Sequence, residues 1–384
     1  MTRPGAAGAK LGVYIHWPYC ARICPYCDFN VFKSRGGEEP AQLARAIVAD
    51  LAAQAEITGP RELVSVFFGG GTPSLMDPDW AGEIVAAAKR LWTPAADLEV
   101  TLEANPTDAE AARFQGFADA GVNRLSLGLQ SLEDDALGFL GRNHDAATAI
   151  RAARAAGRAF PRLSLDLIYA RPGQTPAAWR EELARALDLG PEHLSPYQLT
   201  IEAGTAFDRA VRRGLFAPPD PETGAELFET TQAVLEGAGF EAYEVSNHAR
   251  GDAARSRHNL VYWQGQDYLG VGPGAHGRIT VDGMRQATQA ARRPADYIAA
   301  VAERGVGFAD PELLSPREAA QERLLSGLRI VEGVPFAELT ALNLTPSRLA
   351  GLVQLGLVAE DPERLRATPA GRLVLDRLTA ELAV

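Results

Sequence analysis

Three cysteines carry the clearest chemical signal in this chain of 384 residues. Cys20, Cys24 and Cys27 are its only cysteines and follow a C-x3-C-x2-C spacing. Soft thiolate ligands select iron–sulfur chemistry, and three of them bind three corners of a cubane [4Fe-4S] cluster. The fourth iron then has an open coordination position, which is typical of a reactive metal rather than a structural one. The spacing therefore predicts a [4Fe-4S] cluster with one free iron.

A structural zinc site is the alternative for the same thiols. It would use the three cysteines together with His16. Zinc sites usually combine two separated pairs of ligands, and this chain offers no second pair. An odd number of cysteines in one short stretch also excludes a disulfide framework and indicates a reducing compartment. We therefore favour the iron–sulfur interpretation.

A repeating strand–helix pattern must position these cysteines. Short apolar runs predict six strands near residues 11–16, 64–68, 98–103, 123–129, 163–168 and 193–199. Amphipathic stretches between them predict helices near 39–57, 79–92, 107–120, 144–158 and 176–188. Such repeats indicate an α/β fold with a parallel sheet and right-handed crossovers. Because no Gly-rich dinucleotide fingerprint follows the first strand, a partial (β/α)6 TIM-like barrel fits better than a Rossmann sheet.

In the second half of the chain the pattern of predicted strands and helices is less regular. Residues 201–310 read as a mixed α+β extension with a helix near 221–238 and a Gly-rich segment. Beyond them, helical patterns at 315–328, 345–355 and 369–382 surround a strand-turn-strand candidate at 357–367, which resembles a small winged-helix module. Residues 310–384 contain 8 Arg and no Lys against 11 acidic residues, so we expect packing or a lid rather than DNA binding. We divide the chain into domains at 1–200, 201–310 and 311–384.

Charge and hydropathy exclude several classes of function. The chain has 38 basic and 49 acidic residues and a net charge of −11, whereas nucleic acids and anionic membranes attract the opposite sign. Residues 1–10 lack the apolar region of a signal peptide, and no apolar run reaches the roughly eighteen residues of a transmembrane helix. We expect a cytoplasmic protein with no integral membrane segment and no nucleic-acid partner.

Polar residues follow the predicted strands, at the end of a β/α barrel where reactive groups gather. The second strand ends in the segment 69–73 (GGGTP), whose glycines let a charged ligand approach the backbone. Glu103 ends the third strand and suits a ribose or an ammonium group. Gln130 and Arg142 follow the fourth strand and suit a ribose hydroxyl and a carboxylate. Asp166 lies within the fifth strand, where a buried charge requires a partner or a ligand.

The cysteine spacing after the first strand of a β/α barrel resembles the radical S-adenosylmethionine (SAM) superfamily. The resemblance implies that SAM chelates the open iron and that one electron from the cluster cleaves its sulfonium, releasing a 5′-deoxyadenosyl radical. Over nearly the whole chain it extends to the oxygen-independent coproporphyrinogen dehydrogenase group, through segments 141–145 (GRNHD), 166–169 (DLIY) and 172–175 (PGQT). The positions that touch SAM in that group correspond here to Tyr14, Tyr26, Gly70, Gly71, Thr72, Glu103, Gln130, Arg142 and Asp166.

Two departures separate the chain from the decarboxylating members of this group. Those enzymes have a fourth cysteine where this chain has Phe29, and a longer arm where only nineteen residues precede Cys20. Residues 258–263 (HNLVYW) resemble instead the H-N-x-x-Y-W signature of the haem chaperone (HemW-type) branch. The resemblance implies haem binding through an imidazole iron ligand and flat aromatic faces, at His258, Asn259, Tyr262 and Trp263. The alternative for this motif is a core patch with a satisfied histidine.

We therefore expect a protein that uses a [4Fe-4S] cluster and SAM, binds haem, and delivers haem to a client protein. Flavodoxin or ferredoxin is the expected electron donor, and a homodimer is the expected assembly. SAM cleavage is expected, and coproporphyrinogen turnover is not. One alternative is the oxidative decarboxylation of coproporphyrinogen III to protoporphyrinogen IX. Others are a radical SAM enzyme that opens or alkylates a porphyrin and one that modifies nucleic acids, which the charge of −11 disfavours.

Overall fold

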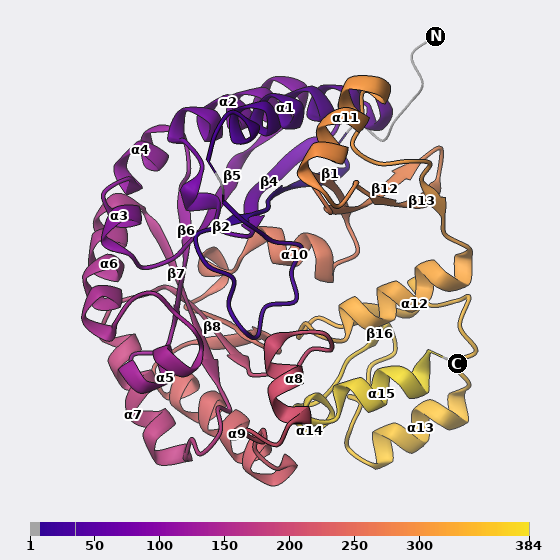
Figure 1. Ribbon diagram of the computed structural model, residues 1–384. Helices are drawn as coiled ribbons and strands as arrows, with labels where there is room; N and C mark the ends of the chain where they lie inside the picture. The colour runs from indigo at the N-terminus through magenta and orange to yellow at the C-terminus, as the bar shows by residue number, and fades with distance from the viewer. Residues whose placement is uncertain (1–7, 35, 384) are drawn as a thin grey trace.

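The computed structural model describes residues 8–34 and 36–383 (Figure 1). The start of the chain, where the sequence indicates no signal peptide, lies outside the described residues up to position 7. Within the described part, no helix combines the length and the apolar character needed to cross a membrane.

Six parallel strands form the centre of the fold, close to the places that the sequence predicts. They are β1 (Lys10–Trp17), β4 (Glu62–Gly70), β5 (Thr93–Ala104), β6 (Arg124–Gln130), β7 (Arg162–Tyr169) and β8 (His193–Gln198). Each pairs in parallel with the next in this order. The strands alternate between apolar side chains such as Leu125 and Leu127, which are fully buried, and polar ones that face the other way. The predicted parallel sheet of a partial barrel is confirmed.

Helices cover the outer face of this sheet, and Figure 1 shows them following its curve. They are α1 (Glu39–Thr58), α2 (Pro78–Leu91), α3 (Asp108–Ala111), α4 (Phe114–Asp119), α5 (Asp134–Phe139), α6 (Ala146–Ala159) and α7 (Pro176–Leu187). The predicted helix over 107–120 is divided in two, and between the two parts the Arg113 side chain donates to the carbonyl oxygens of Ser74 and Met76. The other four helices lie within two residues of the predicted bounds.

The second half of the chain extends both edges of the same sheet, which has twelve strands and stays open. Beside β1 lie β11 (Asp267–Val271), β12 (His276–Val281), β13 (Met284–Gln289) and β14 (Glu312–Leu313); beside β8 lie β10 (Asn247–Ala249) and β9 (Glu241–Glu244). The Gly-rich pattern did not predict strands β11 to β13. Its glycines serve close backbone contacts, since a Cβ on Gly270 would lie 2.1 Å from the His276 carbonyl oxygen.

Three further helices accompany these strands, together with the short pair β2 (Tyr19–Cys20) and β3 (Phe32–Lys33). They are α8 (Ala206–Arg212), α9 (Pro221–Gly237) and α11 (Pro294–Arg304). Helix α9 matches the predicted helix near 221–238 and packs against α7, whereas α11 packs against α1. Residues 201–310 therefore extend the barrel sheet and its helix layer, and do not form a separate unit next to them.

The C-terminal segment has a hydrophobic core of its own, formed by leucines such as Leu324, Leu352 and Leu378. Its elements are α12 (Pro316–Gly327), β15 (Val334–Pro335), α13 (Pro346–Gln354), β16 (Arg364–Leu365), α14 (Pro369–Leu373) and α15 (Leu375–Leu382). The predicted strand-turn-strand forms, with a bridge between Val358 and Ala367, and its second arm also pairs with β15. The predicted helix over 369–382 breaks at Val374, whose backbone leaves the helical region.

Helix α10 (Arg257–Trp263) lies inside the curve of the sheet (Figure 1). A Cβ on Gly12 of β1 would lie 3.1 Å from the Val261 side chain, so this glycine allows the helix to approach the strand. Glu99 of β5, which is 1% exposed, accepts hydrogen bonds from the backbone N–H groups of Arg257 and His258 at 3.2 and 3.1 Å. The carboxylate thereby satisfies the amino end of the helix.

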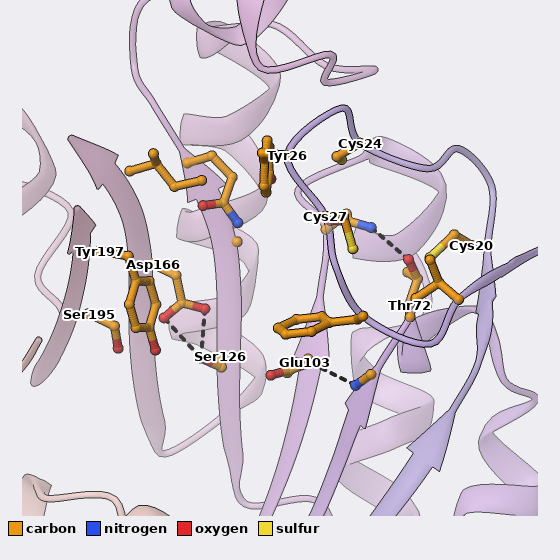
Figure 2. Close-up of a pocket in the computed structure, with 18 of the residues that line it drawn as sticks. Cys20, Cys24, Tyr26, Cys27, Thr72, Glu103, Ser126, Asp166, Ser195 and Tyr197 are labelled. Atoms are coloured by element: carbon orange, nitrogen blue, oxygen red, sulfur yellow. Dashed lines mark hydrogen bonds between the residues drawn. The ribbon is translucent and has the colours of Figure 1, made fainter. Parts of the chain in front are cut away.

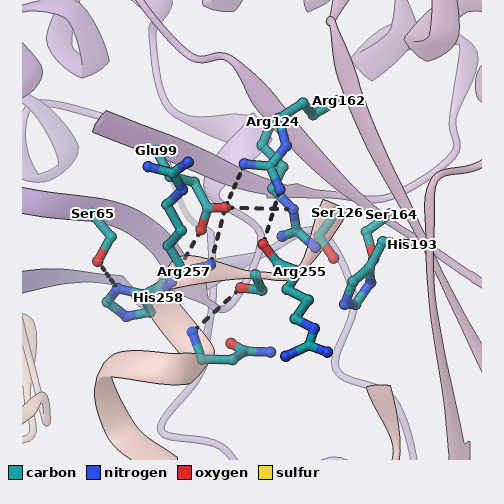
Figure 3. A network of polar contacts seen from close by, with 12 residues as sticks. Ser65, Glu99, Arg124, Ser126, Arg162, Ser164, His193, Arg255, Arg257 and His258 are labelled. Carbon is teal, nitrogen blue, oxygen red and sulfur yellow. Dashed lines mark hydrogen bonds and ion pairs between the residues drawn. The ribbon is translucent and has the colours of Figure 1, made fainter. Parts of the chain in front are cut away.

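The same carboxylate balances the buried Arg124 and the partly buried Arg162, at the amino ends of β6 and β7 (Figure 3). Arg162 donates to Glu99 at 2.8 Å and to Glu192 at 2.8 Å, and Arg124 lies 3.9 Å from Glu99. A buried charge that loses its partner is strongly destabilising, whereas a partly exposed pair contributes little. Glu99 is therefore the residue on which this end of the barrel depends.

We expect Glu99→Gln to lower the free energy of unfolding by about 3–5 kcal/mol, because the buried Arg124 loses its counter-charge and the partly buried Arg162 loses one of its two. Glu192→Gln removes a partner of the same Arg162 but at a side chain that is 33% exposed, and is expected to cost about 1 kcal/mol or less. Urea denaturation of both variants measures the difference. Equal losses would contradict the central role of Glu99.

Candidate functional site

The three cysteines lie on a loop that begins and ends in the strand pair β2–β3. Tyr19 pairs with Phe32 and Cys20 with Lys33 in parallel. Two backbone bonds close the loop, from Phe32 N to the Pro18 carbonyl at 2.8 Å and from Ser34 N to the Cys20 carbonyl at 2.9 Å. The loop therefore leaves and re-enters the fold at one point, directly after β1.

His16 and Asn30 attach the far arm of this loop to the sheet. The His16 ring bonds the Asn30 carbonyl oxygen at 2.9 Å through Nε2 and the Tyr14 hydroxyl at 3.1 Å through Nδ1. The Asn30 amide in turn donates to the carbonyl oxygens of Pro273 and Arg292, at 2.9 and 2.8 Å. Burial lowers the pKa of His16. The imidazole is thus a structural anchor.

The near arm of the loop packs against α8 and the turn after α5. Phe207 N donates to the Pro25 carbonyl at 2.9 Å. The Tyr26 ring lies 6.2 Å from the Phe207 ring. Gly141 has φ +70°, and a Cβ there would lie 2.5 Å from the Pro25 ring. The glycine of the 141–145 segment therefore lets the cysteine loop approach the barrel.

A cavity of about 410 Å³ lies between the cysteine loop and the carboxyl ends of the strands (Figure 2). This volume falls within the range of small-molecule sites. All three cysteines line it, together with eight of the nine residues expected to touch SAM: Tyr26, Gly70, Gly71, Thr72, Glu103, Gln130, Arg142 and Asp166. Tyr14 does not line the cavity. Its ring stacks beside Phe67, with centroids 6.2 Å apart, and its hydroxyl supports His16.

The cysteines fit an iron–sulfur cluster better than zinc. Both ring nitrogens of His16, the proposed fourth zinc ligand, are already bonded, and the ring does not line the cavity. In a cubane each of the three cysteines binds a different iron, and no fourth protein ligand is needed. Burial raises the pKa of the Cys27 thiol to about 11, so a bound metal must displace its proton.

Arg142 connects the cluster loop to the strand ends. One of its terminal nitrogens lies 3.3 Å from Cys24 Sγ and 3.4 Å from the Tyr26 hydroxyl. The other donates to the Gly128 carbonyl at 3.2 Å and to the Asn105 side chain. Its buried Nε has no hydrogen-bond partner among the described residues. The guanidinium therefore brings a fixed positive charge to the side of the cavity beside Cys24.

Two carboxylates occupy the opposite wall. Asp166 accepts hydrogen bonds from Ser126 Oγ at 2.9 and 3.1 Å, and Glu103 Oε2 accepts from Gly70 N at 3.2 Å (Figure 2). Burial and the nearby Asp166 charge raise the pKa of Glu103 to about 8. Burial also raises the pKa of Asp166, against the effect of its serine donors. Two acidic groups in one dry wall favour a cationic ligand between or beside them.

Sequence reasoning missed several polar residues of this wall. In the register of the sheet, Glu103 lies beside Ser126, and Asp166 lies beside Ser195. Arg124 and His193 also line the cavity, which therefore continues toward the network around Glu99. The signal was a serine next to a leucine in three strands, in LSL at 125–127, LSL at 163–165 and LSP at 194–196. With a period of two, these serines share the inner face.

Gln130 completes the fit to a polar ligand. It is one of three described non-glycine residues with positive φ, at +65°, and its buried Oε1 has no hydrogen-bond partner among the described residues. Such strain and an unpaired acceptor are typical of a binding position. The three thiols suit a cluster, and the glycines, Glu103, Gln130, Arg142 and Asp166 suit the charged and hydroxyl groups of SAM. In radical SAM proteins the cluster supplies the electron that cleaves SAM.

Comparisons with known proteins agree with this geometry. The family model "Radical SAM superfamily" matches residues 14–186, and the "HemN C-terminal domain" model matches residues 314–374. "Heme chaperone HemW" of Bacillus subtilis is 35% identical, over 94% of this chain and 96% of the relative. The Mycobacterium tuberculosis (H37Rv) protein of the same name is also 35% identical, over 99% and 97%. The chain belongs to the HemW group of the radical SAM superfamily.

The chain is also similar to a mitochondrial relative and to a solved structure of the same fold. "Radical S-adenosyl methionine domain-containing protein 1, mitochondrial" of Bos taurus is 41% identical, over 99% of the chain and 88% of the relative. The solved structure titled "Coproporphyrinogen III oxidase (HemN) from Escherichia coli is a Radical SAM enzyme" superposes with a TM-score of 0.81 at 22% identity, over 98% of this chain and 91% of that one. The latter similarity establishes the fold.

The structure does not bring the four expected haem residues onto one surface. His258 is 1% exposed; its Nδ1 bonds Ser65 Oγ at 2.8 Å and its Nε2 bonds the Tyr262 hydroxyl at 2.6 Å. Asn259 lines the cavity described above, whereas Tyr262 and Trp263 line a second one. In this structure both His258 nitrogens are bonded inside the core, so the ring would have to release one of these bonds to bind iron. The Gly-rich segment packs against the cysteine loop, because a Cβ on Gly274 would lie 2.5 Å from the Asn30 side chain.

Replacing Cys20, Cys24 or Cys27 with Ala is expected to abolish the absorbance near about 400 nm of anaerobically reconstituted protein, since each thiolate binds its own iron. Iron and sulfide analysis of each variant measures the same loss. A variant that keeps iron, sulfide and colour would contradict the cluster assignment.

Glu103 provides a pH-dependent test. Its folded pKa of about 8 lies above its ordinary value of 4.5, so between these values the folded chain keeps a proton that the unfolded chain releases. Its contribution to the free energy of unfolding therefore falls as the pH rises through this window, by at most about 1.4 kcal/mol per unit. Glu103→Gln is expected to remove this contribution. Urea denaturation from about pH 5 to pH 8 compares the two chains, and identical slopes would contradict it.

Proposed function

We propose that the chain is a haem chaperone, which binds haem and passes it to a haem-dependent client protein. The observation that carries the proposal is similarity over nearly the full length to relatives named haem chaperones, at 33 to 35% identity. In this proposal the cluster and SAM occupy the cavity behind the cysteine loop. A flavodoxin- or ferredoxin-type protein supplies electrons, the assembly is a homodimer, and the location is the cytoplasm.

Phe29 supports this assignment over coproporphyrinogen decarboxylation. It stands at the position where the family resemblance implies a fourth cysteine in the decarboxylating branch. Its ring is 61% exposed and lines the mouth of the cavity. An exposed aromatic ring at the entrance supplies neither a thiolate nor a proton, so the entrance differs chemically from one that carries a cysteine.

The test combines a haem titration with a product assay. We expect the anaerobically reconstituted chain to bind haem, followed by difference absorbance against the cluster-loaded protein. With coproporphyrinogen III, SAM and a reductant, it is expected to form no protoporphyrinogen IX. The Escherichia coli coproporphyrinogen III oxidase (HemN) serves as the positive control.

Turnover of coproporphyrinogen III at a rate comparable with the control would overturn the chaperone proposal. A porphyrin product other than haem, recovered after SAM cleavage, would indicate the porphyrin-modifying alternative. Haem recovered unchanged in a stoichiometric amount would support the chaperone.

A further inference from the structure

A second cavity, of about 640 Å³, lies between α10, the strands β11 to β13 and helix α12 of the C-terminal segment. It is separate from the cavity behind the cysteine loop, and the site described above makes no use of it. Its position between the barrel and the C-terminal segment is a common one for a ligand site. Its volume lies within the usual range for a small-molecule ligand.

The walls of this second cavity suit a flat, largely apolar ligand. Tyr262, Trp263 and Tyr268 form an aromatic wall, in which the Tyr262 and Tyr268 rings meet edge to face at 4.5 Å. Leu325 of α12 adds an apolar side chain that is 60% exposed. The indole Nε1 of Trp263 is buried without a hydrogen-bond partner among the described residues. Aromatic faces of this kind pack against planar ring systems.

The charged groups around this cavity suit a ligand with carboxylates. Arg278, Arg285 and Arg323 line it together with Glu322 and Glu338, and each of the three arginines is paired with a carboxylate. Arg278 pairs with Glu322 at 2.7 Å, Arg285 with Asp267 at 3.3 Å, and Arg323 with Glu338. Arginine forks bind carboxylates in a bidentate manner. A carboxylate of an entering ligand would compete for these guanidinium groups with Glu322, Asp267 and Glu338.

One histidine in the cavity wall is free to bind a metal. Of the six histidines, all within the described residues, His276 is the exposed one, and it lines this cavity. No described residue forms a hydrogen bond with its ring. His16, His193 and His258 each use both ring nitrogens within the fold. His144 and His248 each bond through Nε2 and keep the other nitrogen buried.

We propose that this second cavity is the haem site and that the His276 imidazole is an iron ligand. The proposal rests on the proposed function and gives it a location. Haem combines a planar apolar ring, two carboxylates and an iron that accepts imidazole nitrogen, which are the three properties that these walls complement. Tyr262 and Trp263 of the HNLVYW motif then contact the cargo from α10. His258 is a positioning residue, which holds the Tyr262 hydroxyl from inside the core.

The first experiment replaces His276, the proposed iron ligand. His276→Ala in the full, cluster-loaded chain is expected to weaken haem binding at least about tenfold and to remove the histidine-iron signature from the electron paramagnetic resonance spectrum. Added imidazole is expected to restore that signature. His258→Gln keeps hydrogen-bonding groups for Ser65 and Tyr262 and is expected to retain it. Met284→Ala, at an exposed residue that does not line the cavity, is the control.

The second experiment blocks the cavity. Ala319→Trp places a large side chain in its wall on α12 and is expected to reduce haem binding at least about tenfold. Arg317→Trp adds the same side chain to the same helix at a residue that does not line the cavity, and is expected to bind haem as the unmodified chain does.

The outcomes separate the two proposals. If the unmodified chain binds no haem, both the chaperone function and this site are overturned. If it binds haem while His276→Ala and Ala319→Trp bind equally well, the site alone is overturned. Loss of the histidine signature in His258→Gln, with its retention in His276→Ala, would assign the iron to the buried motif histidine instead.

Discussion

The placement of three thiols over the carboxyl ends of parallel strands is the constraint on which the rest of the structure depends. A loop outside regular structure does not hold three side chains toward one volume by itself. Here the β2–β3 pair closes it, His16 and Asn30 attach one arm, and Pro25 packs the other against Gly141 and α8. Fixing a ligand set before the metal arrives reduces the ordering cost of binding.

Those anchors explain why much of the site could be predicted from the sequence and much could not. The cysteines, the glycines after β4, Glu103 and Asp166 are local signals, because their types and their places at strand ends carry the information. The Asn30 anchor joins residues separated by 243 and 262 positions, and no local pattern reports it. Ser126 and Ser195 resemble ordinary strand residues until the register places them beside the two carboxylates.

The fold was predictable to the same extent and for the same reason. Six apolar runs with helices between them predict the parallel sheet, with ends within two residues of the observed strands except at the start of β5. Strands β11 to β13 were missed because glycines there allow backbone contact, which composition alone reads as a flexible turn. The contacts of the HNLVYW histidine could not be predicted, because its partner Ser65 lies 193 residues away. A motif states which side chains are present but not the direction in which each one faces.

His258 also separates two compartments of the molecule. Its ring stacks on Phe67, with centroids 4.8 Å apart, and Phe67 faces the cavity behind the cysteines. Its other contact, Tyr262, faces the cavity beside α12. Three ring side chains, Phe67, His258 and Tyr262, thus separate the two cavities. The middle member, His258, therefore contacts one wall residue of each cavity.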